Sequence, residues 1–549
     1  MKKTKMGNNY ILLITVICSV VLLMAFGAFY LQIINHNNRY TYSFLDNTLI
    51  ITGFNEKGAA KNIRIPYEID AIQVKGIGPD AFDNEEKINK VVIEDGIEYI
   101  YDYAFANCEN LEEVVLPNSI KYIGEDAFIG CDKLKFYTYE NGNYLGNKKN
   151  NYVAYIKVNN INDKNIILHE ETRTIATSAL KEMKEINEIK FSKYIYKIDP
   201  NLFIHSKISR IEVSEENGYY TSVLGNLYSK DQSRLIRYAS GKNESTFSIP
   251  ENVQYIEKLA FANSTSLAYI RIYSKIKEIG ENAFLGCSGL NYNDYGNTLY
   301  LGNLENPYLA LIKPISEYIS DFKVHPDTHL IANSAFVNCY KLTKAVIPNS
   351  VKYIGLHAFT NCHGLTEVSL PFVGNSSSKE NCYLGYIFKS GENTYHNTGV
   401  PQYLNKVTIT GETSLESYAF SGCLNISKVE FTGKLIEMGE RVFAICKNLE
   451  EVIFCENLIN IGSYTFFECD ALTNVYIPTS VNKIDSFAFH KCINLEKINI
   501  PSSVRYVEQM AFLDCKKLQI YVDLPNKPQT WNDAWNPQTN PVYWQSENN

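Results

Sequence analysis

A phenylalanine, in most cases preceded by alanine, recurs at every twenty-third position over long parts of this chain, and this repeat constrains the fold more than any other feature. Leu180 and Phe203 hold the same place in a weaker pair. A fixed period of roughly 20–50 residues is typical of stacked-repeat architectures. The sequence therefore predicts a repeat solenoid of 23-residue coils, mainly parallel β-structure with short helical turns. The repeat phenylalanines are Phe82, Phe105, Phe128, Phe261, Phe284, Phe336, Phe359, Phe420, Phe443, Phe466, Phe489 and Phe512.

The coil LEEVVLPNSIKYIGEDAFIGC, which begins at Leu111, shows how the period works. Leu111, Val114 and Leu116 are predicted to face inward, and Pro117 ends the strand because proline donates no hydrogen bond to a β-ladder. A second short inward-facing stretch follows. The segment around Phe128 is too short for a regular helix, so we interpret it as one helical turn or a tight loop whose ring fills the interior.

Four intervals between repeat positions are longer than one coil. Apolar alternation and Gly-Asn turn signals within them predict hairpin-like excursions. We interpret them as enlarged coils within one solenoid that covers residues 77–521. The four intervals run from Phe128 to Leu180, from Phe203 to Phe261, from Phe284 to Phe336, and from Phe359 to Phe420.

Both ends of the solenoid depart from the repeat. Residues 35–76 are predicted to be a linker and an N-terminal cap, in which residues 42–53 alternate like a first strand. Residues 522–549 contain Trp531, Trp535 and Trp544, which are all the tryptophans of the chain. Terminal repeats must shield an open core, so a C-terminal cap is predicted. A carbohydrate-stacking patch is the alternative.

The N-terminal stretch 11–34 carries no charge, and it is long enough to cross a bilayer as a helix. Lys2, Lys3 and Lys5 precede it, so residues 1–10 are predicted to be a cytoplasmic tail and the remainder extracellular. We favour an uncleaved transmembrane signal anchor. A cleaved signal peptide and a secreted protein are the alternative.

Ten of the 13 cysteines stand three residues after a repeat phenylalanine. Because they share the period of the core, we expect buried free thiols rather than disulfides or zinc ligands. The histidine pairs His325/His329 and His357/His363 lack a metal-binding motif. No metal site, cofactor or catalytic residue is predicted. The ten cysteines are Cys108, Cys131, Cys287, Cys339, Cys362, Cys423, Cys446, Cys469, Cys492 and Cys515.

The outward strand positions are the candidate functional residues. The net charge of −8 argues against a nucleic-acid partner. One interpretation is a solvated face whose opposite charges pair weakly, at about 0.2–1 kcal/mol each. The other is a broad protein-binding surface mixing aromatic, aliphatic and charged side chains. The candidate binding residues are Tyr269, Arg271, Lys344, Glu367, Lys428, Glu430, Glu451, Tyr476 and Lys497.

The pattern LxxVxIPxSVxxIGxxAFxxC resembles the BspA-type leucine-rich repeat, and the resemblance covers roughly residues 42–544. It implies a cell-surface protein that mediates adhesion or protein binding and is not an enzyme. Our first hypothesis is a membrane-anchored extracellular protein that binds a protein or cell-surface ligand. A structural spacer without a specific ligand and a surface polysaccharide-acting enzyme are the alternatives.

Overall fold

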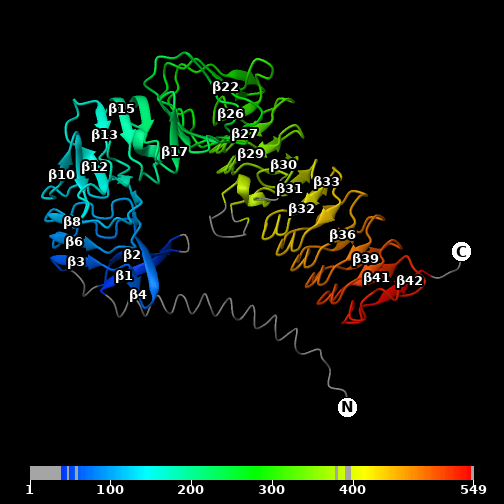
Figure 1. Cartoon of the computed structure of the whole chain (residues 1–549). Helices are drawn as coiled ribbons and strands as arrows, with labels where there is room; N and C mark the ends of the chain where they lie inside the picture. Colours follow the sequence, from blue (N-terminus) through cyan, green and yellow to red (C-terminus); the bar gives the residue numbers. More distant parts are fainter. Residues whose placement is uncertain are drawn as a thin grey trace. The chain divides into compact units, whose positions relative to one another are not determined.

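The computed structural model describes residues 39–45, 48–55, 60–377, 381–389, 397 and 399–545. Its contacts divide the chain into two compact units (Figure 1). Unit 1 comprises the chain up to Asp231 together with Arg237–Lys242, and unit 2 comprises Gln232–Ile236 with the chain from Asn243 onward. The predicted cytoplasmic tail and membrane anchor, residues 1–10 and 11–34, lie outside the described residues. In the part of the chain that is described, no helix has the length and apolarity of a membrane span.

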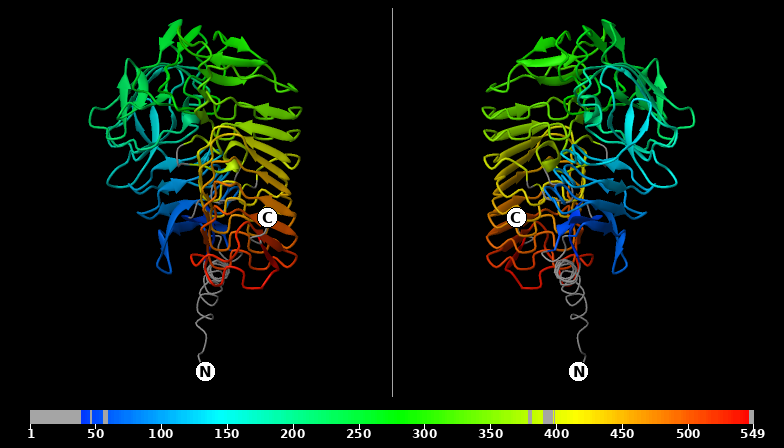
Figure 2. Two further views of the ribbon diagram at one scale, coloured as in Figure 1. Left: turned by 90° about the vertical axis from the view of Figure 1, so that its right-hand side faces the viewer. Right: turned by 90° about the vertical axis from the view of Figure 1, so that its left-hand side faces the viewer.

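Each regular coil contributes a longer strand, a two-residue strand and a compact turn. In the coil that begins at Leu111, these are β8 (Glu113–Val115), β9 (Tyr122–Ile123) and the turn around Phe128. The predicted inward residues Leu111, Val114 and Leu116 are all buried. The predicted repeat solenoid of mainly parallel β-structure is therefore confirmed, and in Figure 2 the coils of unit 2 lie as successive layers, coloured from yellow to red.

The longer strands pair in parallel to form what we call the first ribbon. In unit 1 it consists of β3 (Asn62–Ile65), β6 (Lys90–Ile93) and β8, then β13 (Asn165–Ile167), β15 (Glu185–Phe191) and β16 (Lys207–Val213). In unit 2 it consists of three parallel sheets, namely β20 (Thr246–Ser248) with β22 (Tyr269–Arg271), then β28 (Lys344–Val346), β30 (Glu367–Leu370), β31 (Lys406–Ile409), β33 (Lys428–Phe431) and β35 (Glu451–Ile453), then β37 (Asn474–Tyr476), β39 (Lys497–Ile500), β41 (Gln519–Val522) and β42 (Val542–Trp544).

The second strands of the coils form a second ribbon, and each of these strands buries at least one residue. In unit 1 its strands are β5 (Ile72–Ile77), β7 (Tyr99–Ile100), β9 and β14 (Thr174–Ile175). In unit 2 they are β21 (Tyr255–Ile256), β23 (Glu278–Ile279), β27 (Leu330–Ile331), β29 (Tyr353–Ile354), β32 (Ser414–Leu415), β34 (Glu437–Met438), β36 (Asn460–Ile461), β38 (Lys483–Ile484) and β40 (Tyr506–Val507).

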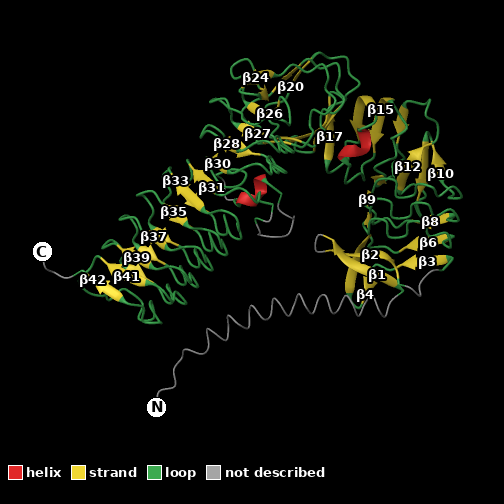
Figure 3. Cartoon of the chain, turned by 180° about the vertical axis from the view of Figure 1, so that it is seen from behind, coloured by secondary structure: helices red, strands yellow, loops and turns green. Residues whose placement is uncertain are grey.

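The turns around the repeat phenylalanines form a third hydrogen-bonded ladder. Tyr103 and Asn107, two residues before and after Phe105, have positive φ angles of 55° and 54°. Phe105 N–H donates to the carbonyl of Ala127 in the next coil at 2.9 Å, whereas Ala106 N–H donates within its own coil to Tyr103 at 3.0 Å. Of the two predicted interpretations, the tight loop is therefore the one observed. Helix within the described residues is limited to the 3-10 segments η1 (Pro200–Phe203) and η2 (Leu384–Ile387), drawn red in Figure 3.

The phenylalanine rings stack into columns through the interior of the coils. The rings of Phe466 and Phe489 have centroids 5.1 Å apart and planes within 12° of parallel. Phe105 and Phe128 stack in the same way at 5.6 Å. Such buried aromatic pairs contribute about 0.5–1.5 kcal/mol beyond their area burial. The same repeat period therefore fills the core and aligns successive coils.

The column cysteines are buried free thiols, as predicted. In eight of them the thiol donates to the carbonyl of the phenylalanine 26 residues earlier, at 2.9–3.1 Å. Cys339 and Cys423, which follow enlarged coils, have no such partner among the described residues. Ser206 takes the cysteine position in its coil, and its hydroxyl donates to the carbonyls of Leu180 at 3.2 Å and Met183 at 2.6 Å.

Two enlarged coils contain the predicted excursions as three-stranded antiparallel segments. The first is β10 (Tyr137–Tyr139), β11 (Gly142–Leu145) and β12 (Ala154–Val158), and β12 then pairs in parallel with β14. The second is β24 (Asn293–Tyr295), β25 (Thr298–Leu301) and β26 (Ala310–Pro314), and β26 pairs in parallel with β27. Each excursion thus rejoins the second ribbon through its last strand.

The other two enlarged coils differ from each other. The one between Phe203 and Phe261 contains the hairpin β17 (Tyr220–Val223) and β18 (Asn226–Ser229), followed by β19 (Arg234–Arg237). In the one between Phe359 and Phe420, the described residues contain η2 and form no antiparallel hairpin, and residues 378–380, 390–396 and 398 lie outside the described part, so the predicted excursion stays a prediction there. Leu384, Ile387 and Phe388, in and directly after η2, are fully buried.

The start of the fold is a hairpin rather than the single strand predicted over residues 42–53. β1 (Tyr40–Leu45) and β2 (Thr48–Phe54) are antiparallel, and β2 pairs in parallel with β5, which also pairs with β4 (Glu68–Ile69). The ring of Phe54 packs against Phe82 at 4.9 Å. Apolar residues on both sides of residues 46–47 belong to opposing strands, which the uninterrupted alternation did not reveal.

At the other end, two of the three tryptophans pack inside the last coil. Trp535 lies edge-on against Phe512 with ring centroids 5.9 Å apart, and Trp531 N–H donates to the carbonyl of Val504 at 3.2 Å. Both rings are buried, so they do not offer a flat face to a carbohydrate. The assignment of residues 35–76 and 522–549 as caps stays a prediction, and this packing favours it.

Candidate binding surface

All nine candidate binding residues lie on the outward face of the first ribbon in unit 2. Their strands alternate, so that inward neighbours such as Val429 and Val475 are buried while the candidates point outward. Tyr269 and Tyr476 are 58% and 57% exposed. Glu367, Lys428 and Glu430 are half-buried, and the remaining four, Arg271, Lys344, Glu451 and Lys497, are exposed.

Four of the candidates form two ion pairs between neighbouring strands. Lys344 lies opposite Glu367, with Nζ and Oε2 3.1 Å apart, and Lys428 lies opposite Glu451 at 2.6 Å. The hydrogen bond with Glu451 raises the pKa of Lys428. Exposed pairs of this kind contribute about 0.2–1 kcal/mol each. This stretch of the ribbon, β28–β35, therefore neutralises much of its own charge.

The C-terminal stretch of the ribbon, β37–β42, is aromatic. The ammonium of Lys497 lies 4.7 Å from the ring centroid of Tyr521, and the rings of Tyr521 and Tyr543 stack at 4.8 Å. The hydroxyl of Tyr476 donates to Oε1 of Glu456 at 2.9 Å, which raises the pKa of this tyrosine. Lys497, Tyr521 and Tyr543 lie on the consecutive strands β39, β41 and β42, with Tyr476 on the adjacent β37. We call these four residues the tyrosine end.

Tyr269 and Arg271 are not brought together with the other candidates by sheet hydrogen bonds. Their strand β22 pairs with β20, and Arg271 then bridges to Gly302 in the enlarged coil rather than to another coil strand. The enlarged coil thus interrupts the first ribbon between β22 and β28. The predicted surface consists of separate stretches.

Sequence reasoning missed Lys406, Tyr521 and Tyr543. Lys406 lies between Glu367 and Lys428 in the register of β31, and its ammonium is 4.0 Å from Glu430. Tyr521 stands three residues after Leu518, whereas Tyr476 stands four residues after Leu472, the equivalent leucine two coils earlier. Tyr543 lies beyond Leu518, the last leucine at this position of the period, so the period did not indicate it.

Two of the histidines considered as metal ligands, His325 and His329, have other contacts. The ring of His325 stacks on Tyr308 with centroids 4.0 Å apart, and Nδ1 of His329 lies 3.1 Å from the carbonyl of Asp327. Across the described ranges, no group of His, Cys, Asp and Glu side chains is arranged to hold a metal ion. What the tyrosine end offers instead is phenol hydroxyls, ring faces and one ammonium, the groups that contact protein surfaces.

Parallel ribbons joined by proline-ended strands and compact turns define a leucine-rich-repeat solenoid. The model of the BspA type leucine rich repeat region matches residues 52–157, 154–224, 237–303, 318–390 and 391–533. These matches cover more than half of the chain. The chain belongs to the BspA-type leucine-rich repeat family.

The chain is similar to several solved bacterial leucine-rich repeat proteins. One from Bacteroides ovatus is 20% identical, with 93% of this chain and 99% of that chain covered and a TM-score of 0.31. A leucine rich cell surface protein from Faecalibacterium prausnitzii is 19% identical, with coverages of 89% and 94% and a TM-score of 0.26. The pneumococcal vaccine antigen PcpA is 16% identical, with coverages of 93% and 98% and a TM-score of 0.28. No curated protein matches the chain.

Proposed function

We propose that this protein is a membrane-anchored extracellular repeat protein that binds a protein or cell-surface ligand through the first ribbon of unit 2. The observation that carries the proposal is the tyrosine end, where Tyr476 and Tyr543 are about half exposed and the ammonium of Lys497 lies over the ring of Tyr521. Tyrosine is enriched in protein interfaces because it combines a large apolar ring with a polar tip. Membership of a family that the resemblance links to bacterial surfaces and adhesion supports the same function.

The ion-paired stretch β28–β35 has a different part in this proposal. Two ion pairs already form within this stretch, Lys344 with Glu367 and Lys428 with Glu451. A ligand therefore gains little affinity by replacing them. They would affect the orientation and the rate of approach of a charged partner. We therefore expect the tyrosine end to supply affinity and the charged stretch to supply selectivity.

The membrane anchor is proposed from the sequence of residues 11–34. The absence of charge over this whole stretch, together with the three lysines before it, supports a single-pass topology with the repeats outside the cell. Detection of the intact N-terminus on the membrane-associated protein by mass spectrometry tests this part. Recovery of only a shortened form in the medium would favour signal-peptide cleavage.

The binding experiment uses the full chain against extracellular-matrix proteins and intact cells. Replacing Tyr476, Tyr521 and Tyr543 with alanine should weaken saturable binding by at least about tenfold, the effect of losing one interface hot spot. The matched control replaces three exposed tyrosines from elsewhere, Tyr137, Tyr219 and Tyr318, which are 44%, 52% and 67% exposed. Equal loss in both triple variants would contradict a localised site.

The two alternatives give different results in the same assays. A structural spacer would show no saturable binding by the unmodified chain on any matrix protein or cell. A polysaccharide-acting enzyme would release products from a panel of surface glycans. Either result would replace the binding proposal.

A further inference from the structure

A segment that contains an enlarged coil occurs twice in the chain, once in each unit, at a constant offset in sequence. Phe128 and Phe284 are 156 positions apart, and so are Lys157 and Lys313. The two copies share their internal packing as well. His169 stacks on Tyr152 and His325 stacks on Tyr308, both with ring centroids 4.0 Å apart. Each copy therefore provides an independent view of the same local structure.

Both copies contain a pocket at the same place. The first has a volume of about 230 Å³ and the second about 310 Å³. Fourteen of the seventeen residues that line one pocket have their equivalent, at the same offset, in the lining of the other. The pocket is thus a property of the enlarged coil itself, since the two units form it from two separate segments of the chain.

The floor of each pocket lies at a break in the phenylalanine column. The ring of Phe128 stacks on Phe105 and lines the first pocket, and Phe284 stacks on Phe261 and lines the second. In both copies the next repeat position comes only after the excursion. Ile156 and its equivalent Ile312, on the last strand of each excursion, add to this apolar floor.

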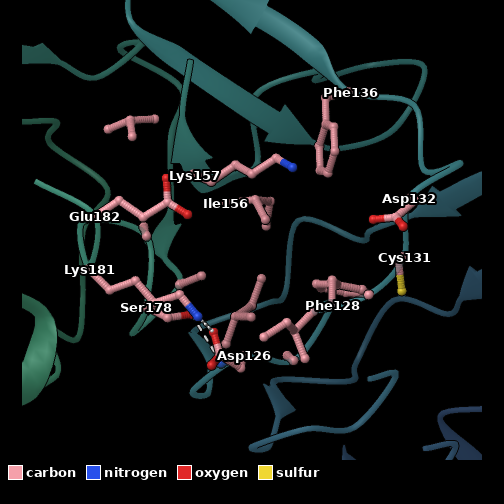
Figure 4. Close-up of a pocket in the computed structure, with 17 residues that line it drawn as sticks. Asp126, Phe128, Cys131, Asp132, Phe136, Ile156, Lys157, Ser178, Lys181 and Glu182 are labelled. Carbon is pink, nitrogen blue, oxygen red and sulfur yellow. Dashed lines mark hydrogen bonds and ion pairs between the residues drawn. The ribbon is translucent and has the colours of Figure 1, made fainter. Parts of the chain in front are cut away.

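A lysine on an aromatic ring stands beside the floor in both copies. Figure 4 shows Lys157 extending towards the ring of Phe136, where its Nζ lies 4.9 Å from the centroid. Lys313 lies over Tyr292 in the same way, at 5.3 Å. Neither ammonium has a carboxylate partner among the described residues, whereas Lys344 and Lys428 of the first ribbon are both ion-paired.

Each pocket also has a carboxylate that forms no ion pair within the described part of the chain. In the first pocket these are Asp132 and Glu182, which Figure 4 shows on opposite sides, while Asp126 is neutralised by Lys181 at 2.6 Å. In the second pocket it is Glu317. Glu182 and Glu317 occupy non-equivalent positions. The two copies therefore combine an apolar floor, one ammonium and an unpaired carboxylate through partly different residues.

We propose that each of these two pockets binds one apolar α-amino acid. The ligand carboxylate pairs with Lys157 or Lys313, its ammonium pairs with Glu182 or Glu317, and its side chain lies on the phenylalanine floor. At roughly 30 Å³ for a water-sized group, the two volumes accommodate a ligand of roughly 8 to 10 heavy atoms, the size of leucine or isoleucine. This binding is separate from ligand recognition by the first ribbon.

Ligands of other charge fit the pockets less well. A simple anion would approach the unpaired carboxylates Asp132 and Glu182 in the first pocket, and a simple cation would find the face of Phe136 already covered by Lys157. A neutral apolar ligand would bury surface around an ammonium and a carboxylate without pairing either group. A zwitterion with an apolar side chain satisfies the floor and both charges together.

The test is calorimetric titration of the full chain with L-leucine, N-acetyl-L-leucine and L-leucinamide. We expect leucine to bind at two sites per chain, and each blocked analogue to bind at least about tenfold more weakly because one charge pair is lost. Lys157→Met, which keeps a side chain over Phe136, should leave one site, and Lys157→Met with Lys313→Met should leave none. The matched control is Lys149→Met, an exposed lysine of the same enlarged coil that does not line the pocket.

Three results would overturn the proposal. They are the absence of saturable heat with leucine, binding of leucinamide or N-acetyl-leucine as tight as that of leucine, and two remaining sites in the double lysine variant. Thermal melting of each variant establishes that it is folded. The analogue titrations need no variant, so they decide the question independently of folding.

Discussion

The uninterrupted coils from Phe420 to Phe512 and the enlarged coil between Phe284 and Phe336 show two uses of the same repeat within unit 2. In the uninterrupted run, each of the middle rings Phe443, Phe466 and Phe489 stacks on both sides. At the enlarged coil, Phe284 stacks on Phe261 and its surroundings open into a pocket. Continuity of the column thus favours stability, and its interruption creates surface that a ligand can reach.

The thiol hydrogen bonds follow the same division. They form where one regular coil follows another, because the donor and the acceptor carbonyl are then 26 residues apart in sequence. Cys339 and Cys423 stand directly after enlarged coils, and no described residue provides the equivalent carbonyl. The thiol of each regular coil therefore takes its hydrogen-bond acceptor from the coil before it. An insertion removes this hydrogen bond from the coil that follows the insertion.

The largest effect is expected for a ring in the middle of the uninterrupted column. Phe466→Ala should lower the free energy of unfolding by about 3–5 kcal/mol, since it removes a fully buried ring and two stacking contacts. Phe284→Ala should cost less, because that ring stacks on one side and lines a pocket. Denaturant unfolding of both variants measures the difference. Equal costs would show that the column does not act as a continuous element.

The next effect is a dependence of stability on pH at the junction where the uninterrupted run begins. Glu412 occupies the inward position that Leu435 holds one repeat later, and its carboxylate accepts a hydrogen bond from Val373 N–H at 2.8 Å. Burial raises the pKa of Glu412 to about 7, from an ordinary value of 4.5. Because the folded state binds this proton more tightly, the contribution of Glu412 to stability is greatest below about pH 4.5 and is lost as the pH rises through 7.

The titration of Glu412 should lower the free energy of unfolding at pH 8 by about 3 kcal/mol relative to its value below pH 4.5. Glu412→Leu should remove this contribution, so the variant should gain stability over the unmodified protein as the pH is raised from 5 to 8. Thermal melting of both proteins at the two pH values measures the gain. A constant difference between them would mean that Glu412 does not titrate in this range.

A smaller effect distinguishes cysteines within the run from those after an enlarged coil. Cys469→Ser should cost less than about 1 kcal/mol, because its hydroxyl can donate to the carbonyl of Phe443 as Ser206 does in its own coil. Cys423→Ser should cost about 1–3 kcal/mol, because a buried hydroxyl would lack a partner. Chemical denaturation compares the two, and the reverse order would contradict the proposed role of the preceding coil.

The smallest effect concerns the ion pairs on the first ribbon. Lys428→Glu should destabilise by about 0.2–1 kcal/mol, and exchange of the two charges in the variant Lys428→Glu with Glu451→Lys should restore most of this loss. The measurement is a double-mutant cycle at low and high salt. An interaction that does not weaken in high salt would contradict an exposed electrostatic pair.

Much of the fold was predictable because the same spacing of apolar residues recurs in many coils. The inward positions, the buried cysteines and the two antiparallel excursions of equal length all follow from period and alternation. The start of the fold was less predictable, since β1 and β2 share one alternating pattern. The burial of Leu384, Ile387 and Phe388 in the fourth enlarged coil was not predictable either, because it depends on tertiary contacts that have no local period.

The candidate surface was predictable in its outward orientation but not in its pairing. Sequence places Lys344 and Glu367 on one face, and register decides that they meet at 3.1 Å. The tyrosine end required the alignment of β41 and β42, because Tyr521 and Tyr543 do not share one position of the period. The duplicated pockets required both the excursion strands and the broken column.

The sequence by itself determined the repeating coil, its core and the face that points outward, because periodic burial depends on local spacing. Only the tertiary structure decided which outward residues are neighbours and where the core opens. Those contacts join residues one coil or more apart in sequence, and insertions change the register between them. Binding surfaces and pockets therefore depend on how the coils stack, whereas the conformation and the core positions of a single coil follow from its own sequence.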